Sequence, residues 1–137
     1  MQLDVRRRNL QHNEENTRAK TFLVDAGRSN IYLFKSKLGE GESGRISING
    51  KTIGKLETQT FFMRSVEPGS YKISSVGEET SKLAIEVMAG KNYFIWHDVV
   101  TGSTFGGRTK VSYKLKQISE DDGKKNIKES RMLSSSF

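Results

Sequence analysis

The chain contains no cysteine and few of the residues from which metal sites and catalytic centres are most often built. Its 137 residues include two histidines and a single proline. The absence of cysteine excludes disulfide bonds, thiolate zinc sites and thiol nucleophiles. No apolar run approaches the ~20 residues that a membrane-spanning helix needs. Residues 1–16 contain the basic cluster Arg6, Arg7 and Arg8 without a following apolar stretch, so they do not form an intact signal peptide.

Positive charge exceeds negative charge mainly at the two ends of the chain. The formal net charge is +7. Residues 1–29 hold six basic and four acidic side chains, residues 30–107 hold nine and eight, and residues 108–137 hold eight and four. A nearly neutral middle with basic ends favours a solvated globular body over a groove built to hold phosphates. The length suits one domain.

From residue 30 onward, short runs rich in Ile, Val, Tyr and Phe alternate with turn signals. The runs occupy residues 30–35, 45–48, 51–56, 60–66, 70–76, 82–88, 92–100 and 108–118. In the first run, NIYLFK, apolar residues fall on both faces, which predicts a strand covered on both sides. Asn49 and Gly50 join two runs, and both residues accept the positive φ of a type I′ hairpin turn. No helical pattern separates the runs, so we predict a mainly β fold, an antiparallel β-sandwich of about seven or eight short strands.

A short helix is expected at the C-terminal end. Residues 119–133 open with Ser119, and Asp122 stands three residues later, as in a capping box. Acids in the first turn and bases in the last turn complement the helix dipole, and Ile127 would anchor the helix, whereas Gly123 weakens the prediction. The chain is thus expected to have three parts: an N-terminal arm that is partly flexible or helical (1–29), a β-sandwich domain (30–118), and a short C-terminal helix with a frayed tail (119–137).

The order of these strands and turns resembles that of one protein family. NIYLFK is followed by ISINGKTIG, then by EPGSY and LAIEVMAGKNYF. From about Asn30 to Arg131 this succession resembles the bacterial domain-of-unknown-function 2846 family, whose members are often exported lipoproteins, and it is distantly similar to PEGA-type modules. The resemblance implies a β-sandwich and no catalytic residues. It also implies a periplasmic or outer-membrane-associated location if an export signal was removed; the alternative is cytoplasmic, because the sequence shows no signal.

Two short motifs are partly similar to catalytic or nucleotide-binding sites. The segment GSTFGGRT (102–109) fits a phosphate-binding loop only with Arg108 in place of lysine, and a strand is expected after it where such a loop needs a helix. His97 and Asp98 are neighbours on a strand and point to opposite faces, so they cannot form a dyad or share a metal. His12 lies in the arm. We therefore predict no catalytic, cofactor or metal site, and no enzyme.

Aromatic residues are spread over most of the predicted strands. An aromatic platform could bind single-stranded nucleic acid or sugar, but two facing sheets need large side chains to fill their core. Core filling is therefore the favoured interpretation. Trp96 and Phe105 are the exceptions, because they flank the glycine-rich loop, and they are the predicted ligand contacts.

The strand over residues 108–118 carries the strongest functional signal. Val111, Tyr113 and Leu115 are expected to face the core. The lysines of the opposite face and of the following helix are predicted to contact an anionic partner: Lys110, Lys114, Lys116, Lys124, Lys125 and Lys128. The alternative is a solvated face that discourages edge-to-edge aggregation. Only lysine and serine occur on this face, which favours nonspecific charge attraction over base recognition.

Two functions are compatible with these features. The first is a noncatalytic binding or structural module of the bacterial cell envelope, which contacts an envelope protein or an anionic surface, for example through strand addition at an exposed edge. The second is a cytosolic nucleic-acid-associated protein that uses its basic ends. A mobility-shift experiment over a salt series distinguishes them, because phosphate contacts weaken steeply as salt rises.

Overall fold

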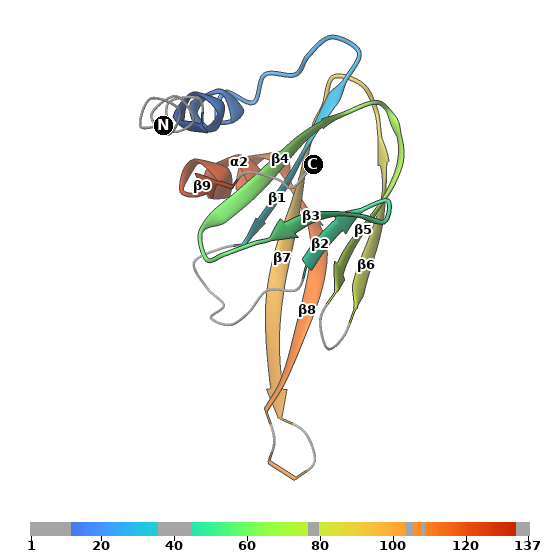
Figure 1. Ribbon diagram of the computed structural model, residues 1–137, viewed down its shortest axis with the longest axis vertical. Helices are drawn as coiled ribbons and strands as arrows, with labels where there is room; N and C mark the ends of the chain where they lie inside the picture. Colours follow the sequence, from blue (N-terminus) through green and yellow to red (C-terminus); the bar gives the residue numbers. More distant parts are fainter. Residues whose placement is uncertain (1–11, 36–44, 77–79, 104–105, 108, 134–137) are drawn as a thin grey trace, which may run out of the picture.

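The computed structural model describes residues 12–35, 45–76, 80–103, 106–107 and 109–133, with the backbone alone described over 99–103 and 109–113. A helix over residues 12–19 precedes the first strand. The other elements are, in chain order, β1 (Ser29–Lys35), β2 (Arg45–Ile48), β3 (Lys51–Lys55), β4 (Thr60–Val66), β5 (Gly69–Val76), β6 (Ser81–Val87), β7 (Asn92–Ser103), β8 (Thr109–Ile118), α2 (Glu120–Lys128) and β9 (Arg131–Met132) (Figure 1).

The strands form two sheets with a shared core, which confirms the predicted β-sandwich. One sheet has five strands in the order β8-β7-β1-β4-β9, and the other has four in the order β3-β2-β5-β6. The four-stranded sheet is antiparallel throughout, whereas β1 pairs with β7 and β4 pairs with β9 in parallel. These parallel pairs differ from the purely antiparallel sandwich that was predicted. The strands of each parallel pair are not consecutive in the chain, so no tight hairpin turn joins them and the antiparallel direction is not imposed.

The β2–β3 hairpin has the turn that its sequence predicts. At Asn49 and Gly50 φ is 49° and 83°, the positive values that a type I′ turn requires. A β-bulge follows, where the register between β2 and β3 shifts between Ile46 and Ser47. The bulge turns Ile53 into the core, although Lys51 and Lys55 on either side of it are exposed. β3 lies at the edge of its sheet.

Apolar side chains from both sheets fill the space between them. The buried members are Ile31, Leu33, Ile46, Ile48, Ile53, Leu56, Phe62, Ile73, Ile85, Val87, Ile95 and Leu115. Most of them occupy alternate positions along their strands, so the residues between them face away from this core. Leu115 is therefore buried as predicted. The side chains of Val111 and Tyr113, for which the same was expected, lie outside the described part of the chain.

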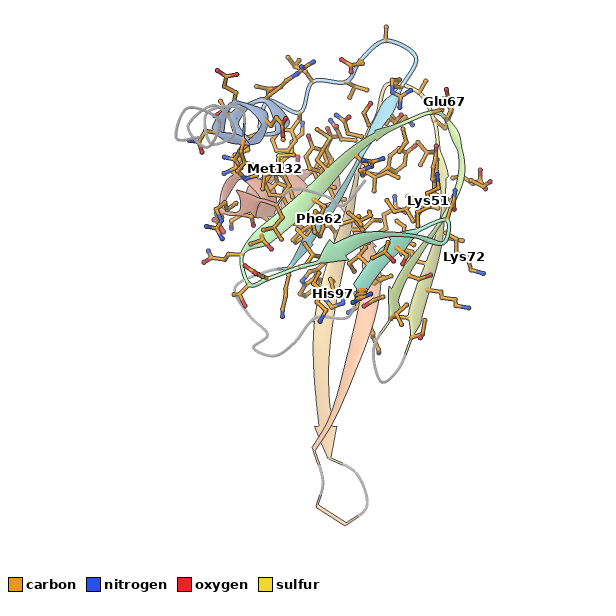
Figure 2. All side chains as sticks on the ribbon, in the orientation of Figure 1. Lys51, Phe62, Glu67, Lys72, His97 and Met132 are labelled. Atoms are coloured by element: carbon orange, nitrogen blue, oxygen red, sulfur yellow. The ribbon has the colours of Figure 1, made fainter. Side chains whose placement is uncertain are left out.

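A second core covers the other face of the five-stranded sheet, beneath the two helices (Figure 1). Its buried members are Ala19, Tyr32, Phe34, Phe61, Phe94, Ile127 and Met132. The rings of Tyr32 and Phe94 stack with 5.1 Å between their centroids, and the Tyr32 hydroxyl donates a hydrogen bond to the carbonyl of Ala19 at 2.6 Å. Figure 2 shows Met132 close to the helices and Phe62 among the strands. Every residue of β1 is buried, which confirms that this strand is covered on both sides.

The C-terminal helix begins as the sequence predicts. The Ser119 side chain accepts a hydrogen bond from the backbone N–H of Asp122, and α2 follows directly. Ile127 anchors the helix in the second core. Gly123 is also buried, and a Cβ atom there would lie 2.1 Å from Cγ of Phe94. The glycine that weakened the prediction is thus the residue that lets the helix approach the sheet. Beyond α2 the chain forms β9, which the sequence did not predict.

The segment between the first helix and β1 is held against the sheet by two asparagines. The side-chain amide of Asn30 donates to the carbonyl of Leu23 at 3.0 Å, and that of Asn92 donates to the carbonyl of Phe22 at 2.8 Å. Asn30 and Asn92 are also paired in register between β1 and β7. This part of the predicted arm is therefore packed on the sandwich. Residues 1–11 and the tail, 134–137, lie outside the described residues.

Candidate functional site

A polar group lies inside the sandwich at the end of β1. Lys35 ends β1, His97 lies on the neighbouring strand β7, and Ser75 comes from β5 of the facing sheet. The Ser75 hydroxyl and Nε2 of His97 are 2.7 Å apart. The exposed fractions of these residues are 1% for Lys35, 1% for His97 and 0% for Ser75. Figure 2 shows His97 low in the sandwich, close to β2 and β7.

Burial decides the protonation of this group. It lowers the pKa of His97 to about 4, with a further contribution from the positive charge of Lys35, and it lowers the pKa of Lys35 as well. The imidazole is therefore neutral at neutral pH. A serine beside a neutral histidine is a nucleophile–base pair in many acyl-transfer enzymes. Here all three residues are enclosed, and the contact between Ser75 and His97 joins the two sheets.

His97 and Asp98 point to opposite faces of β7, as their adjacency predicts. The Asp98 carboxylate lies 3.3 Å from Nζ of Lys116 on β8 and takes no part in the buried group. The glycine-rich segment 102–109 connects β7 to β8, so the element after it is a strand and not the helix of a phosphate-binding loop. Within the described ranges, no three His, Asp or Glu residues are grouped as a metal site would require.

The predicted lysine patch is partly offset by acidic residues. Lys116 pairs with Asp98, and Lys124 pairs with Glu120 at 2.9 Å within α2. The other exposed lysines of the patch are Lys114, Lys125 and Lys128. Lys110 is paired with Gly102 through the backbone, but its side chain lies outside the described part of the chain. Besides Glu120, two more acids in the first turn of α2, Asp121 and Asp122, reduce the positive charge of this surface further.

Trp96 is not an exposed platform. It is half-buried against the second core, and its ring centroid lies 5.6 Å from Nζ of Lys116, in cation–π range. The lysine face therefore has an aromatic neighbour from β7, whereas the strand sequence suggested only lysine and serine. Phe105, the other predicted contact, lies outside the described residues. Tyr32, Phe34, Phe61 and Phe94 fill the core as expected.

The outer face of the four-stranded sheet carries a basic surface that was missed in the sequence. Each strand contributes one cation whose neighbours in the chain turn toward the core. The four cations are Arg45 on β2, Lys55 on β3, Lys72 on β5 and Lys82 on β6, and all are exposed. We call this surface the basic sheet face. Glu86 is the acidic residue that the described strands place on it, and small residues lie between the charges: Ser47, Thr52, Ser74 and Ala84. Figure 2 shows Lys72 pointing away from the body.

The basic sheet face exists because the fold separates charges that are mixed along the chain. Glu57 and Glu67 lie in connections between strands, and Asp98 lies on the other sheet. Four more glutamates of this region lie outside the described residues: Glu40, Glu42, Glu78 and Glu79. The ion pairs formed by described residues involve none of the four cations. Arg45 is even paired in register with Lys55, an arrangement of like charges that destabilises a sheet.

A cavity of about 420 Å³ lies between the first helix and the five-stranded sheet. Tyr32, Met63 and Met132 line it, and Arg18 and Asp25 form an ion pair of 3.6 Å at its exposed side. The charged groups at this cavity are of both signs, so the cavity selects no ligand by charge.

Comparison with known proteins identifies the family. A sequence model of DUF2846, described as a protein of unknown function, matches residues 25–108, more than half of the chain. The chain belongs to the DUF2846 family. It is also similar to an uncharacterized protein of Haemophilus influenzae Rd, with 34% identity over 122 residues, which cover 87% of this chain and 70% of that protein.

The DUF2846 match spans β1 to β7 and so includes the basic sheet face and the buried Ser75–His97 pair. The lysines of β8 and α2 lie beyond its end. Among the described residues of this DUF2846 protein, neither helix has the length and apolar composition to cross a membrane.

Proposed function

We propose that this DUF2846 protein is a noncatalytic binding module of the bacterial cell envelope, periplasmic or associated with the outer membrane. The observation that carries the proposal is a contrast within the sandwich. Its serine–histidine pair is enclosed, whereas the basic sheet face is open and has cations without ion pairs among the described residues. A partner outside the protein cannot contact enclosed groups, whereas exposed charge of one sign attracts partners of the opposite sign.

The envelope location is supported by the resemblance to a family whose members are often exported. Bacterial envelopes also present anionic surfaces, which suit an open basic face. The basic sheet face lies within the family match, so it is the preferred contact surface.

Two measurements test the proposal. The complete gene product, tagged at its C-terminus, is followed by cell fractionation, and we expect it in the periplasmic or outer-membrane fraction. The purified chain is then sedimented with isolated envelopes over a salt series, and we expect binding that decreases as salt screens the charges. Recovery in the cytosol contradicts the location, and absence of the chain from the envelope pellet contradicts the binding.

Association with nucleic acid is the competing outcome. Mixed-sequence duplex and single-stranded DNA are titrated under the same conditions. A steep loss of DNA affinity with salt, together with cytosolic recovery, would favour the nucleic-acid-associated protein. The half-buried position of Trp96 argues against stacking of bases on that residue.

A further inference from the structure

We propose that the basic sheet face docks on the surface of an anionic lipid bilayer, with cations at the headgroups and two apolar side chains at its ends entering the interface. This inference rests on the proposed envelope function and names the partner of that surface. It follows from the charge of the face, from the position of exposed apolar residues, and from the small size of the residues between them.

The charge of the face is positive, and none of its four cations forms an ion pair with another described residue. Its four cations and single carboxylate leave a net charge of +3. The carboxylate of Glu86 accepts a hydrogen bond from the hydroxyl of Ser70, its neighbour across β5 and β6. The opposition of Arg45 and Lys55 is unfavourable in the isolated chain, and an anionic surface against this face would relieve it.

Exposed apolar side chains lie at both ends of the same two strands. Val76 ends β5 and is 50% exposed, and it faces away from the core because Ser75 before it is fully buried. Met88 follows β6 directly and is 61% exposed, after the buried Val87. Val76 is paired in register with Arg45, so an apolar group adjoins a cation at this end. Cations beside exposed apolar side chains are the combination by which proteins attach to the bilayer interface.

The middle of the face allows close contact over a wide area. Ser47, Thr52, Ser74 and Ala84 are small, so the longer side chains of the cations extend beyond them. The eight residues of β5 span ~26 Å, at the usual rise of a strand. The described residues of this face include no aromatic ring on which bases or sugars could stack. A soluble polyanion would satisfy the cations but offers no apolar layer for Val76 and Met88, whereas a bilayer offers both.

The test measures binding of the purified full chain to lipid vesicles by flotation. Vesicles of phosphatidylcholine mixed with phosphatidylglycerol are compared with vesicles of phosphatidylcholine alone, at low and high salt. We expect binding to the anionic vesicles that falls with salt, and little binding to the neutral ones. Each Lys or Arg at such a surface contributes on the order of a fivefold gain, so the double variant Lys72→Gln/Lys82→Gln should bind roughly 30-fold more weakly.

A matched control removes the same charge from the other side of the protein. Lys114→Gln/Lys125→Gln changes the net charge equally but lies in the lysine patch of β8 and α2, and it should bind like the unchanged chain. Met88→Ser should weaken binding without changing its salt dependence, because it removes an apolar contact and no charge. All variants are at exposed positions, and thermal unfolding confirms that each is folded.

Three results would overturn the inference. These are absence of binding to anionic vesicles, equal losses in the two double variants, and tighter binding to DNA of matched phosphate concentration than to vesicles. If isolated envelopes still sediment the chain while lipid vesicles do not, the bilayer is the wrong partner and the proposed envelope function stands. If envelopes fail to sediment the chain as well, both fail.

Discussion

Gly123 lets α2 pack closely against Phe94 of the five-stranded sheet, and its replacement by alanine tests that packing. A Cβ atom at this position would lie 2.1 Å from Cγ, 2.5 Å from Cδ1 and 2.6 Å from Cβ of Phe94. The ring of Phe94 has little room to move, because it stacks on Tyr32 and lies 5.9 Å from the ring of Phe22 between centroids. Gly123→Ala should therefore force α2 away from the sheet and loosen the contact of Ile127.

Two opposing effects set the size of the change. Alanine favours a helix by about 1 kcal/mol over glycine. Overpacking of a well-filled core costs about 1 to 3 kcal/mol, and three contacts below 3.0 Å place Gly123→Ala at the upper end of that range. The net effect is a loss of about 2 kcal/mol in the free energy of unfolding. In a chain of 137 residues this corresponds to a fall in Tm of about 8 °C.

Urea unfolding followed by circular dichroism measures the effect. Lys125→Ala is the matched control, since it changes an exposed residue of the same helix and should shift stability by less than about 0.5 kcal/mol. Phe94→Leu provides a second check, because the cost of Gly123→Ala should shrink when the ring is absent. A Gly123→Ala protein as stable as the unchanged chain, or more stable, would refute the close packing of α2 on Phe94.

Three further predictions concern local interactions. Ser119→Ala removes the acceptor of the Asp122 N–H and should lower stability by about 1 kcal/mol in urea unfolding; an unchanged midpoint would show that the cap is not formed. Tyr32→Phe leaves the carbonyl of Ala19 without its hydroxyl partner and should lower the free energy of unfolding by about 1 to 3 kcal/mol. Proteolysis near the first helix should become faster, and equal cleavage rates would count against the contact. The pKa of His97 is lowered on folding, so the unfolded chain binds more protons than the folded chain in acid. Stability should therefore fall as pH drops below about 6.5, where the unfolded histidine gains its proton, and level off near pH 4, where the folded histidine gains it too. Between about pH 8 and pH 5 the loss should be on the order of 2 kcal/mol in urea unfolding and absent in His97→Gln; an equal loss in both would exclude His97 as its source.

The fold was predictable where the residues of one short segment by themselves determine its local structure. NIYLFK shows apolar residues on both faces, and β1 is buried throughout. Asn49-Gly50 specifies its turn, and Ser119 with Asp122 specifies the start of α2. The parallel pairing of β1 with β7 was not predictable in this way, because it depends on the path of the chain between two sheets. The sequence alone made Gly123 appear unfavourable, because glycine is a poor helix former. The space that requires glycine there is set by the ring of Phe94, which lies on a distant strand.

The candidate site was harder to predict, because its residues come from separate segments. The lysines of β8 were found by alternation within one strand. The basic sheet face takes one cation from each of four strands, so it becomes visible only when the register of those strands is known. The same is true of the pair formed by Ser75 and His97, which come from different sheets. The acids that offset the lysine patch include Asp98, which arrives from the neighbouring strand.

Lysine footprinting on isolated envelopes tests most directly which surface makes contact. The purified chain is treated with an amine-reactive reagent alone and in the presence of envelopes, and the modification of each lysine is measured by mass spectrometry. We predict that Lys55, Lys72 and Lys82 become protected by envelopes while Lys114 and Lys125 react as before. Protection of Lys114 and Lys125 with no change at Lys72 and Lys82 would contradict the assignment of the basic sheet face.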